Sequence, residues 1–189
     1  MKQIKFAGLM LAAIFSMNSA FAQGNGMKEK TVEVGGAAMY PSKNIIDNAV
    51  NSKDHTTLVA AVKAAGLVET LQTAGPFTVF APTNDAFGML PAGTVEALVM
   101  PENKARLTSI LTYHVVAGRL GTQELDELIK KGKGVAELVT VAGGKLWIIK
   151  KDAKYWLKDE NGGMAQLTIC NVYQSNGVIH VIDHVVLPK

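Results

Sequence analysis

The chain has 189 residues, of which 48% are hydrophobic, 19% charged and 6% aromatic, a composition typical of a globular protein and not of a disordered one. It lacks a run of about 18 apolar residues that would span a membrane, and the formal net charge of +3 is too small to predict a nucleic-acid-binding surface. The single cysteine, Cys170, excludes an internal disulfide and a thiolate metal cluster.

The first 22 residues have the pattern of a secretory signal peptide. A positively charged start, a short apolar segment and a small-x-small cleavage site follow one another: Lys2 and Lys5, residues 6–17, and Ala20-Phe21-Ala22. Cleavage after Ala22 leaves 189 − 22 = 167 residues. We therefore predict a secreted or periplasmic protein. Residues 23–41 are rich in glycine and show no periodicity, which predicts a flexible leader.

The next part of the chain has mainly helical patterns. Apolar residues recur at helical spacing, and β-branched or aromatic segments interrupt them twice. The predicted helical segments are 42–71, 82–87, 94–100, 101–111 and 122–131. The two predicted strands in this part are 77–80 and 113–116.

After Gly134 the pattern changes to strands. Short β-rich segments alternate with the turn sequences Gly-Gly, Lys-Asp, Asn-Gly-Gly and Asn-Gly. The predicted strands are 135–141, 145–150, 155–157, 165–172 and 178–187. Helices gathered in one half and strands in the other predict a single α+β domain over residues 42–189 and not a βαβ array.

Three segments carry a resemblance to one family. They are FTVFAPTNDAF at 77–87, LTYHVVAG at 111–118 and SNGVIHVIDHVVLP at 175–188. In order and spacing they are similar to the first conserved box, the Tyr-His motif and the second box of the fasciclin (FAS1) domain. The resemblance implies a β-wedge of about seven strands with several helices packed around it. It also implies secreted or cell-surface proteins that mediate adhesion and matrix contacts.

These motifs contain the candidate site residues. They are Thr83, Asn84, Asp85, Tyr113, His114, His180 and Asp183. One interpretation is a ligand or adhesion contact, and the other is a structural role. Asn84 and Asp85 fall in the first turn of a short predicted helix, where side-chain oxygens cap free N–H groups. His114 and His180 lie in predicted strands between apolar neighbours, which is typical of core histidines bonded to the backbone or a carboxylate.

No catalytic or metal-binding pattern accompanies these residues. His180 and His184 are four residues apart on one predicted strand, so their Cα atoms would be about 13 Å apart, too far to share one zinc ion. The sequence contains no zinc-protease, serine-hydrolase, phosphate-loop or dinucleotide signature. We therefore predict neither an enzyme nor a metal or cofactor site.

A second candidate surface lies on the predicted hairpin over 145–157. Trp147, Tyr155 and Trp156 cluster there among lysines, and such aromatic residues can stack on sugars or bases. A solvated hairpin with one packed aromatic face is the commoner arrangement. The predicted function is an exported binding module for a surface polysaccharide or protein. The alternative, which the resemblance also implies, is a carrier of a small apolar ligand such as a carotenoid.

The cysteine bears on the oligomeric state. An unpaired cysteine in an oxidising compartment tends to pair between chains when it is exposed. The polar residues Gln166 and Thr168 share the predicted strand face of Cys170, so we expect this thiol to be partly exposed. The prediction is a monomer that slowly forms a disulfide-linked dimer.

Overall fold

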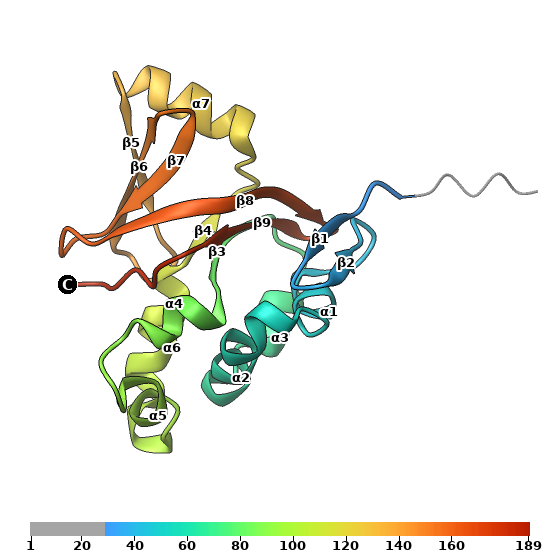
Figure 1. The fold of residues 1–189 in the computed structure, drawn as a ribbon, viewed down its shortest axis with the longest axis vertical. Helices are drawn as coiled ribbons and strands as arrows, with labels where there is room; N and C mark the ends of the chain where they lie inside the picture. The colour runs from blue at the N-terminus through green and yellow to red at the C-terminus, as the bar shows by residue number, and fades with distance from the viewer. Residues whose placement is uncertain (1–28) are drawn as a thin grey trace, which may run out of the picture.

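A mixed sheet and several short helices make up the computed structural model, which describes residues 29–189 (Figure 1). The predicted signal peptide and the start of the leader lie outside the described residues. The strands are β1 (Val32–Val34), β2 (Ala37–Met39), β3 (Phe77–Pro82), β4 (Val115–Ala117), β5 (Val135–Val139), β6 (Lys145–Lys151), β7 (Lys154–Lys158), β8 (Met164–Gln174) and β9 (Gly177–Ile182). The helices are α1 (Ile45–Ala49), α2 (Thr56–Ala65), α3 (Val68–Gln72), α4 (Asn84–Gly88), α5 (Thr94–Leu98), α6 (Lys104–Tyr113) and α7 (Thr122–Lys131), with the 3₁₀ turns η1 (Lys53–His55) and η2 (Pro101–Asn103).

Seven strands form one nearly closed sheet in the order β4-β3-β9-β8-β7-β6-β5. β3 and β9 pair in parallel, and the other neighbouring strands pair antiparallel. An isolated bridge between Val116 and Thr140 joins β4 to the segment after β5, so the two ends of the sheet approach each other. The predicted α+β class, with a wedge of about seven strands and several packed helices, is confirmed.

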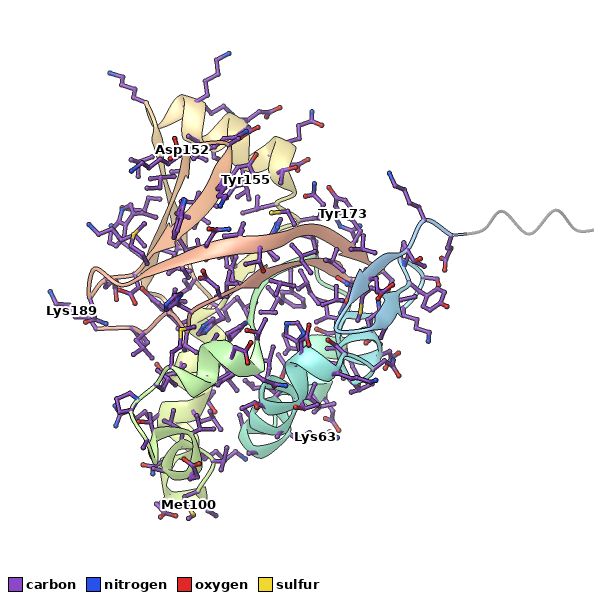
Figure 2. The ribbon with its side chains drawn as sticks, in the orientation of Figure 1. Lys63, Met100, Asp152, Tyr155, Tyr173 and Lys189 are labelled. Atoms are coloured by element: carbon purple, nitrogen blue, oxygen red, sulfur yellow. The ribbon has the colours of Figure 1, made fainter. Side chains whose placement is uncertain are left out.

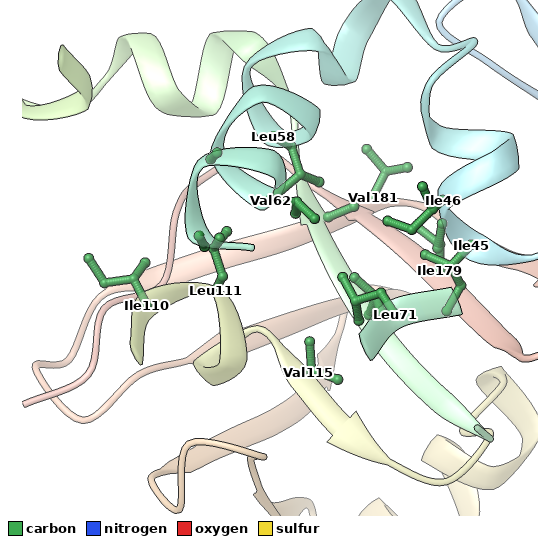
Figure 3. Close-up of a cluster of buried hydrophobic side chains, with 14 of the residues drawn as sticks. Ile45, Ile46, Leu58, Val62, Leu71, Ile110, Leu111, Val115, Ile179 and Val181 are labelled. Carbon is green, nitrogen blue, oxygen red and sulfur yellow. The ribbon is translucent and has the colours of Figure 1, made fainter. Parts of the chain in front are cut away.

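Strands β3 and β9 separate two apolar clusters. On β3, Val79 and Ala81 contribute to the first cluster while Phe80 contributes to the second. On β9, Val181 and Ile182 divide in the same way. Helices α1, α2, α3 and α6 cover the first cluster (Figure 3), and α7 closes the second against β5, β6 and β7 (Figure 1). Both faces of β3 and β9 are therefore buried, which explains their nearly continuous apolar sequences.

The described part of the predicted flexible leader is ordered. β1 and β2 form a hairpin within residues 23–41, and Val34 and Met39 are only 4% and 3% exposed because they pack into the first cluster. Gly35 and Gly36 have φ angles of 58° and 73°, the left-handed backbone that a two-residue hairpin turn requires. The Gly-Gly pair therefore indicates a turn, but each flanking strand has only three residues, too few to show the alternation of apolar and polar residues that predicts a strand.

Three other elements differ from the prediction. The helical segment 42–71 is divided into α1, α2 and α3, and α2 ends at Gly66, whose φ of 73° is left-handed. The strand predicted over 113–116 begins at Val115, because Tyr113 ends α6 and His114 caps it in a right-handed helical conformation. The last strand ends at Ile182, so His184 does not share a strand with His180. Within residues 29–189, none of the helices has the length and apolar character needed to cross a membrane.

The hairpin turn yields a test of its packing. A Cβ atom on Gly35 would overlap Ser52 Oγ and lie 2.7 Å from the backbone nitrogen of Asp54, whereas one on Gly36 would meet nothing within 4 Å. Gly35→Ala should therefore lower the free energy of unfolding by about 3 kcal/mol, and Gly36→Ala by about 1 kcal/mol from backbone strain alone. Urea unfolding of the two variants measures the difference. Equal losses would contradict the contact between this turn and η1.

Candidate functional site

The residues of the first box join α4 to the helices beside it. Thr83 is the N-cap of α4, and its Oγ1 accepts a hydrogen bond from the Ala86 N–H at 3.2 Å. Asn84 reaches across to the start of α2, where its Oδ1 accepts from the Thr57 N–H at 2.9 Å and its Nδ2 donates to the Lys53 carbonyl at 2.8 Å. Asp85 is exposed in the first turn of α4, and the cap of this helix is Thr83 and not Asn84 or Asp85 as predicted.

Tyr113 and His114 are buried at the end of α6. The Tyr113 hydroxyl donates to the Lys145 carbonyl at 2.6 Å and accepts from the Glu160 N–H at 3.2 Å, and burial raises its pKa to about 12. His114 Nδ1–H donates to the Ile110 carbonyl at 2.8 Å, and Nε2 accepts from the Val186 N–H at 3.2 Å. Both nitrogens of a neutral imidazole are thereby paired, and burial lowers the pKa of His114 to about 4.

The residues of the second box also contact the backbone. His180 Nε2–H donates to the Leu120 carbonyl at 2.7 Å, and its ring stacks on Phe80 with 5.8 Å between centroids. Burial lowers the pKa of His180. Asp183 Oδ1 accepts from the Gln166 N–H at 2.7 Å and from His184 Nδ1 at 2.8 Å.

These seven residues do not converge on one point. Thr83, Asn84 and Asp85 lie at α4, while the two histidines bond to Ile110, Val186 and Leu120 in separate parts of the fold. In the part of the chain that the structure describes, no three His, Cys, Asp or Glu side chains lie together as metal ligands. Most of these side chains bond to backbone groups of other segments of the chain.

The contacts of the buried polar residues Asp159 and Asn176 were not predicted from the sequence. Asp159 is 3% exposed, and its carboxylate accepts from the N–H groups of Asn161, Gly163 and Leu187 at 2.7–3.0 Å. Asn176 accepts from the Ile45 N–H at 3.0 Å and donates to the Leu71 carbonyl at 2.7 Å. Both lie in the turns that separate predicted strands, but their distant partners carry no local sequence signal.

An apolar cavity of about 80 Å³ lies between the first helices and the sheet. Its lining includes Leu58, Val62, Leu71, Leu111 and His55. His55 is 4% exposed, and its Nδ1 lies 2.9 Å from Ser52 Oγ. Its Nε2 has no hydrogen-bond partner among residues 29–189, and burial lowers its pKa.

The two tryptophans lie on the face of β5, β6 and β7 that is turned away from α7. Tyr155, predicted to cluster with them, points to the opposite face, where its hydroxyl donates to Asp126 on α7 at 2.7 Å. Trp147 and Trp156 alternate with the fully buried Ile148 and Leu157 and are therefore on the outer side of the sheet. Figure 2 shows these strands with Tyr155 and, at the β6–β7 turn, Asp152 labelled.

We call this outer surface the tryptophan face. It comprises Val135, Glu137, Val139, Lys145, Trp147, Ile149, Lys151, Lys154, Trp156 and Lys158. Cross-strand pairing sets Trp156 opposite Ile149, Trp147 opposite Lys158 and Lys151 opposite Lys154. On the neighbouring β5, Val135 and Val139 are 44% and 60% exposed. Trp147 and Trp156 are half-buried, and aromatic residues are enriched in interaction surfaces.

Comparison with known proteins places the chain in a family. The family model described as "Fasciclin domain" matches residues 53–188. The chain belongs to the fasciclin domain family. The three motifs recognised in the sequence occupy β3 with α4, α6 with β4, and β9 of this fasciclin domain, and they are neighbours in the sheet because β3 pairs with both β4 and β9.

Relatives and one solved structure agree with this assignment. Protein sll1483 of Synechocystis sp. is 47% identical over 160 residues, which cover 85% of this chain and 82% of that protein. Cell surface glycolipoprotein MPB83 of Mycobacterium bovis is 34% identical over 161 residues, covering 82% of this chain and 64% of that protein. A FAS1 domain pair from the insect cell adhesion molecule Fasciclin I aligns with a TM-score of 0.69 and 16% identity over 85% of this chain and 58% of that one, which shows a shared fold.

The buried His114 of this fasciclin domain predicts a pH-dependent stability. Its pKa is about 4 in the folded protein and 6.5 in the unfolded chain. Between these pH values the unfolded chain binds a proton that the folded one does not, so the free energy of unfolding falls as the pH falls. The His114 contribution should decrease by roughly 2 kcal/mol between pH 7 and pH 5. Burial also lowers the pKa values of His55 and His180, so these two residues add to the loss of stability as the pH falls.

Substitution isolates this contribution. At pH 7, His114→Ala should lower the free energy of unfolding by about 2–4 kcal/mol, because it opens a cavity and leaves two backbone groups unpaired. The difference in the free energy of unfolding between the variant and the unsubstituted protein should be roughly 2 kcal/mol smaller at pH 5 than at pH 7, because only the unsubstituted protein loses the His114 contribution. Urea unfolding at both pH values measures it, with the exposed His184→Ala as control. A difference that does not change with pH would show that His114 is not held neutral.

Proposed function

We propose that this fasciclin domain is an exported, non-enzymatic binding module that contacts a surface polysaccharide or protein through the tryptophan face. The observation that carries the proposal is the position of Trp147 and Trp156 on the outer side of a sheet whose inner side already contains a complete apolar layer. Tryptophan is among the residues that contribute most to binding energy in interfaces. The names of two similar proteins, a cell surface glycolipoprotein and an insect cell adhesion molecule, support a surface role.

We propose that the fasciclin motif residues act through the fold and not through chemistry. The contacts of His114, His180 and Asp183 with backbone groups support this role, because each side chain is already paired within the domain. Neutral, deeply buried imidazoles are poorly placed to exchange protons with a bound substrate. The binding surface is therefore separate from the residues that the family motifs share.

The proposed location is outside the cytoplasm. The positive start, the apolar segment and the cleavage pattern ending at Ala22 support export, with a mature chain that begins at Gln23 in the periplasm or the medium. Cys170 is half-buried, and burial raises the pKa of its thiol. A raised pKa lowers the thiolate fraction, which favours a monomer and makes the disulfide-linked dimer slow to form.

Two tryptophan substitutions test the proposed surface. Trp147→Thr with Trp156→Thr keeps residues suited to a strand and removes both indoles. If each indole contributes about 2 kcal/mol, affinity for any glycan or protein found on an array should fall at least a hundredfold. Tyr40→Ala, which removes a 39%-exposed aromatic ring from the other end of the molecule, is the control. Unchanged binding by a folded double variant would refute the proposed surface.

The cavity favours a second candidate function, a carrier of a small apolar ligand such as a carotenoid. Its walls are almost entirely apolar, and the unpaired Nε2 of His55 could accept or donate one hydrogen bond to a polar end group. The volume of about 80 Å³ is smaller than the roughly 150 Å³ of an engineered cavity that binds benzene. A carotenoid would therefore require the helices over the first cluster to move apart.

The colour of the purified protein distinguishes the carrier function from the binding-module function. A carrier purified from carotenoid-producing cells should absorb visible light, and Val62→Phe should reduce that absorbance severalfold by filling the cavity. Val99→Phe makes the same change at a position that is 39% exposed and should leave the absorbance unchanged. A colourless protein from such cells, or equal absorbance in the two folded variants, would argue against the carrier function.

A further inference from the structure

The lysines of the tryptophan face are arranged around its apolar centre. Along the paired strands β6 and β7, Lys158 lies beside Trp147 at one end, and Lys151 lies opposite Lys154 at the other. Trp156 and Ile149 occupy the row between them. Lys154 and Lys158 are four residues apart on β7, so the Cα atoms at the two ends are about 13 Å apart. The face thus has cationic ends and an apolar, aromatic middle.

Most of this positive charge is not neutralised within the domain. Of the charged residues on the face, four are lysines and one is Glu137, which forms an ion pair with Lys145 at 2.9 Å. The remaining three lysines have no carboxylate within ion-pair distance among residues 29–189. Lys151 and Lys154 also face each other directly across the strands, and like charges in that position are destabilising. A negatively charged partner would relieve this repulsion.

We propose that the tryptophan face binds an acidic polysaccharide whose sugar rings carry carboxylates, an inference that rests on the proposed function and names the partner class. Sugar rings have apolar C–H faces that stack on indole rings, while uronate carboxylates pair with lysine ammonium groups. A polymer presents both features repeatedly, which suits two indoles flanked by cations at both ends. Trp147 and Trp156 are half-buried and the lysines at the two ends are exposed, so an extended chain can lie across these strands.

Polygalacturonate is a direct probe of this proposal. The full chain should bind it, and affinity should fall steeply as salt is raised, because exposed charge pairs are screened. The methyl-esterified polymer has the same rings without the charges and should bind about tenfold more weakly, as expected for the loss of several exposed ion pairs. Equal binding of the charged and esterified polymers would overturn the proposal.

Matched lysine variants locate the contact. Replacing Lys151, Lys154 and Lys158 by glutamine should reduce polygalacturonate affinity about tenfold and flatten its salt dependence. The control replaces Lys53, Lys63 and Lys104, three exposed lysines on the helical side where Figure 2 labels Lys63, and should change affinity less than twofold. Both variants lose the same net charge, so equal losses of affinity would refute a specific role for the face.

The outcomes separate this inference from the proposed function. One outcome is that the Trp147 and Trp156 double variant no longer binds an array ligand, whereas the Lys151, Lys154 and Lys158 variant still binds it. This result would support the tryptophan face as the binding surface and exclude an acidic polysaccharide as its partner. The same conclusion follows if the face captures an acidic protein or anionic lipid vesicles but not polygalacturonate. If neither variant affects any ligand that the chain binds, both the proposed surface and the polysaccharide are wrong. Loss of polygalacturonate binding in both variants supports both.

Discussion

The parallel pairing of β3 with β9, buried on both faces, is the constraint on which the rest of the domain depends. A strand pair with two buried faces needs an apolar layer on each side, so the domain has two clusters and not one. Helices α1, α2, α3 and α6 cover one side. On the other side the sheet folds round through β8, and α7 with β5, β6 and β7 supplies the cover (Figure 1).

This double burial also determines what the polar motif residues do. A side chain such as His180 in β9 has no solvent to bond to, and an unpaired buried group costs about 1–3 kcal/mol. Its imidazole therefore bonds to the backbone of Leu120, 60 residues away in the chain, as His114 does to Val186, 72 residues away. In this chain the two motif histidines thus join segments that the topology brings together.

Elements could be predicted from the sequence where the interaction that forms them is between residues close together in the chain. Thr83 before α4 and the helix over 122–131 are local patterns that the structure contains. The turn predicted at Asn176-Gly177 lies one residue earlier, at Ser175-Asn176, because Gly177 already pairs with Gln174. The strand predicted to include His114 was wrong, because α6 continues two residues beyond the predicted end at 111 and His114 is its C-cap. The hairpin β1–β2 and the burial of His55 depend on packing against distant residues. The pairing of Trp147 with Lys158 depends on strand register, which the sequence alone does not specify.

The packing contacts and the proposed binding surface lie on opposite faces of the same three strands. On the inner face of β6 and β7, Leu146, Ile148 and Leu157 are fully buried and supply the apolar contacts that hold the sheet to α7. The outer face does not have to contribute to that layer, so it can retain features that a core would not tolerate, such as two opposed lysines beside two tryptophans. Because strand side chains alternate, a substitution on the outer face leaves the inner packing in place. Residues of the proposed binding surface can therefore change without a change of fold, whereas a change at His114 or His180 removes hydrogen bonds that hold distant segments together.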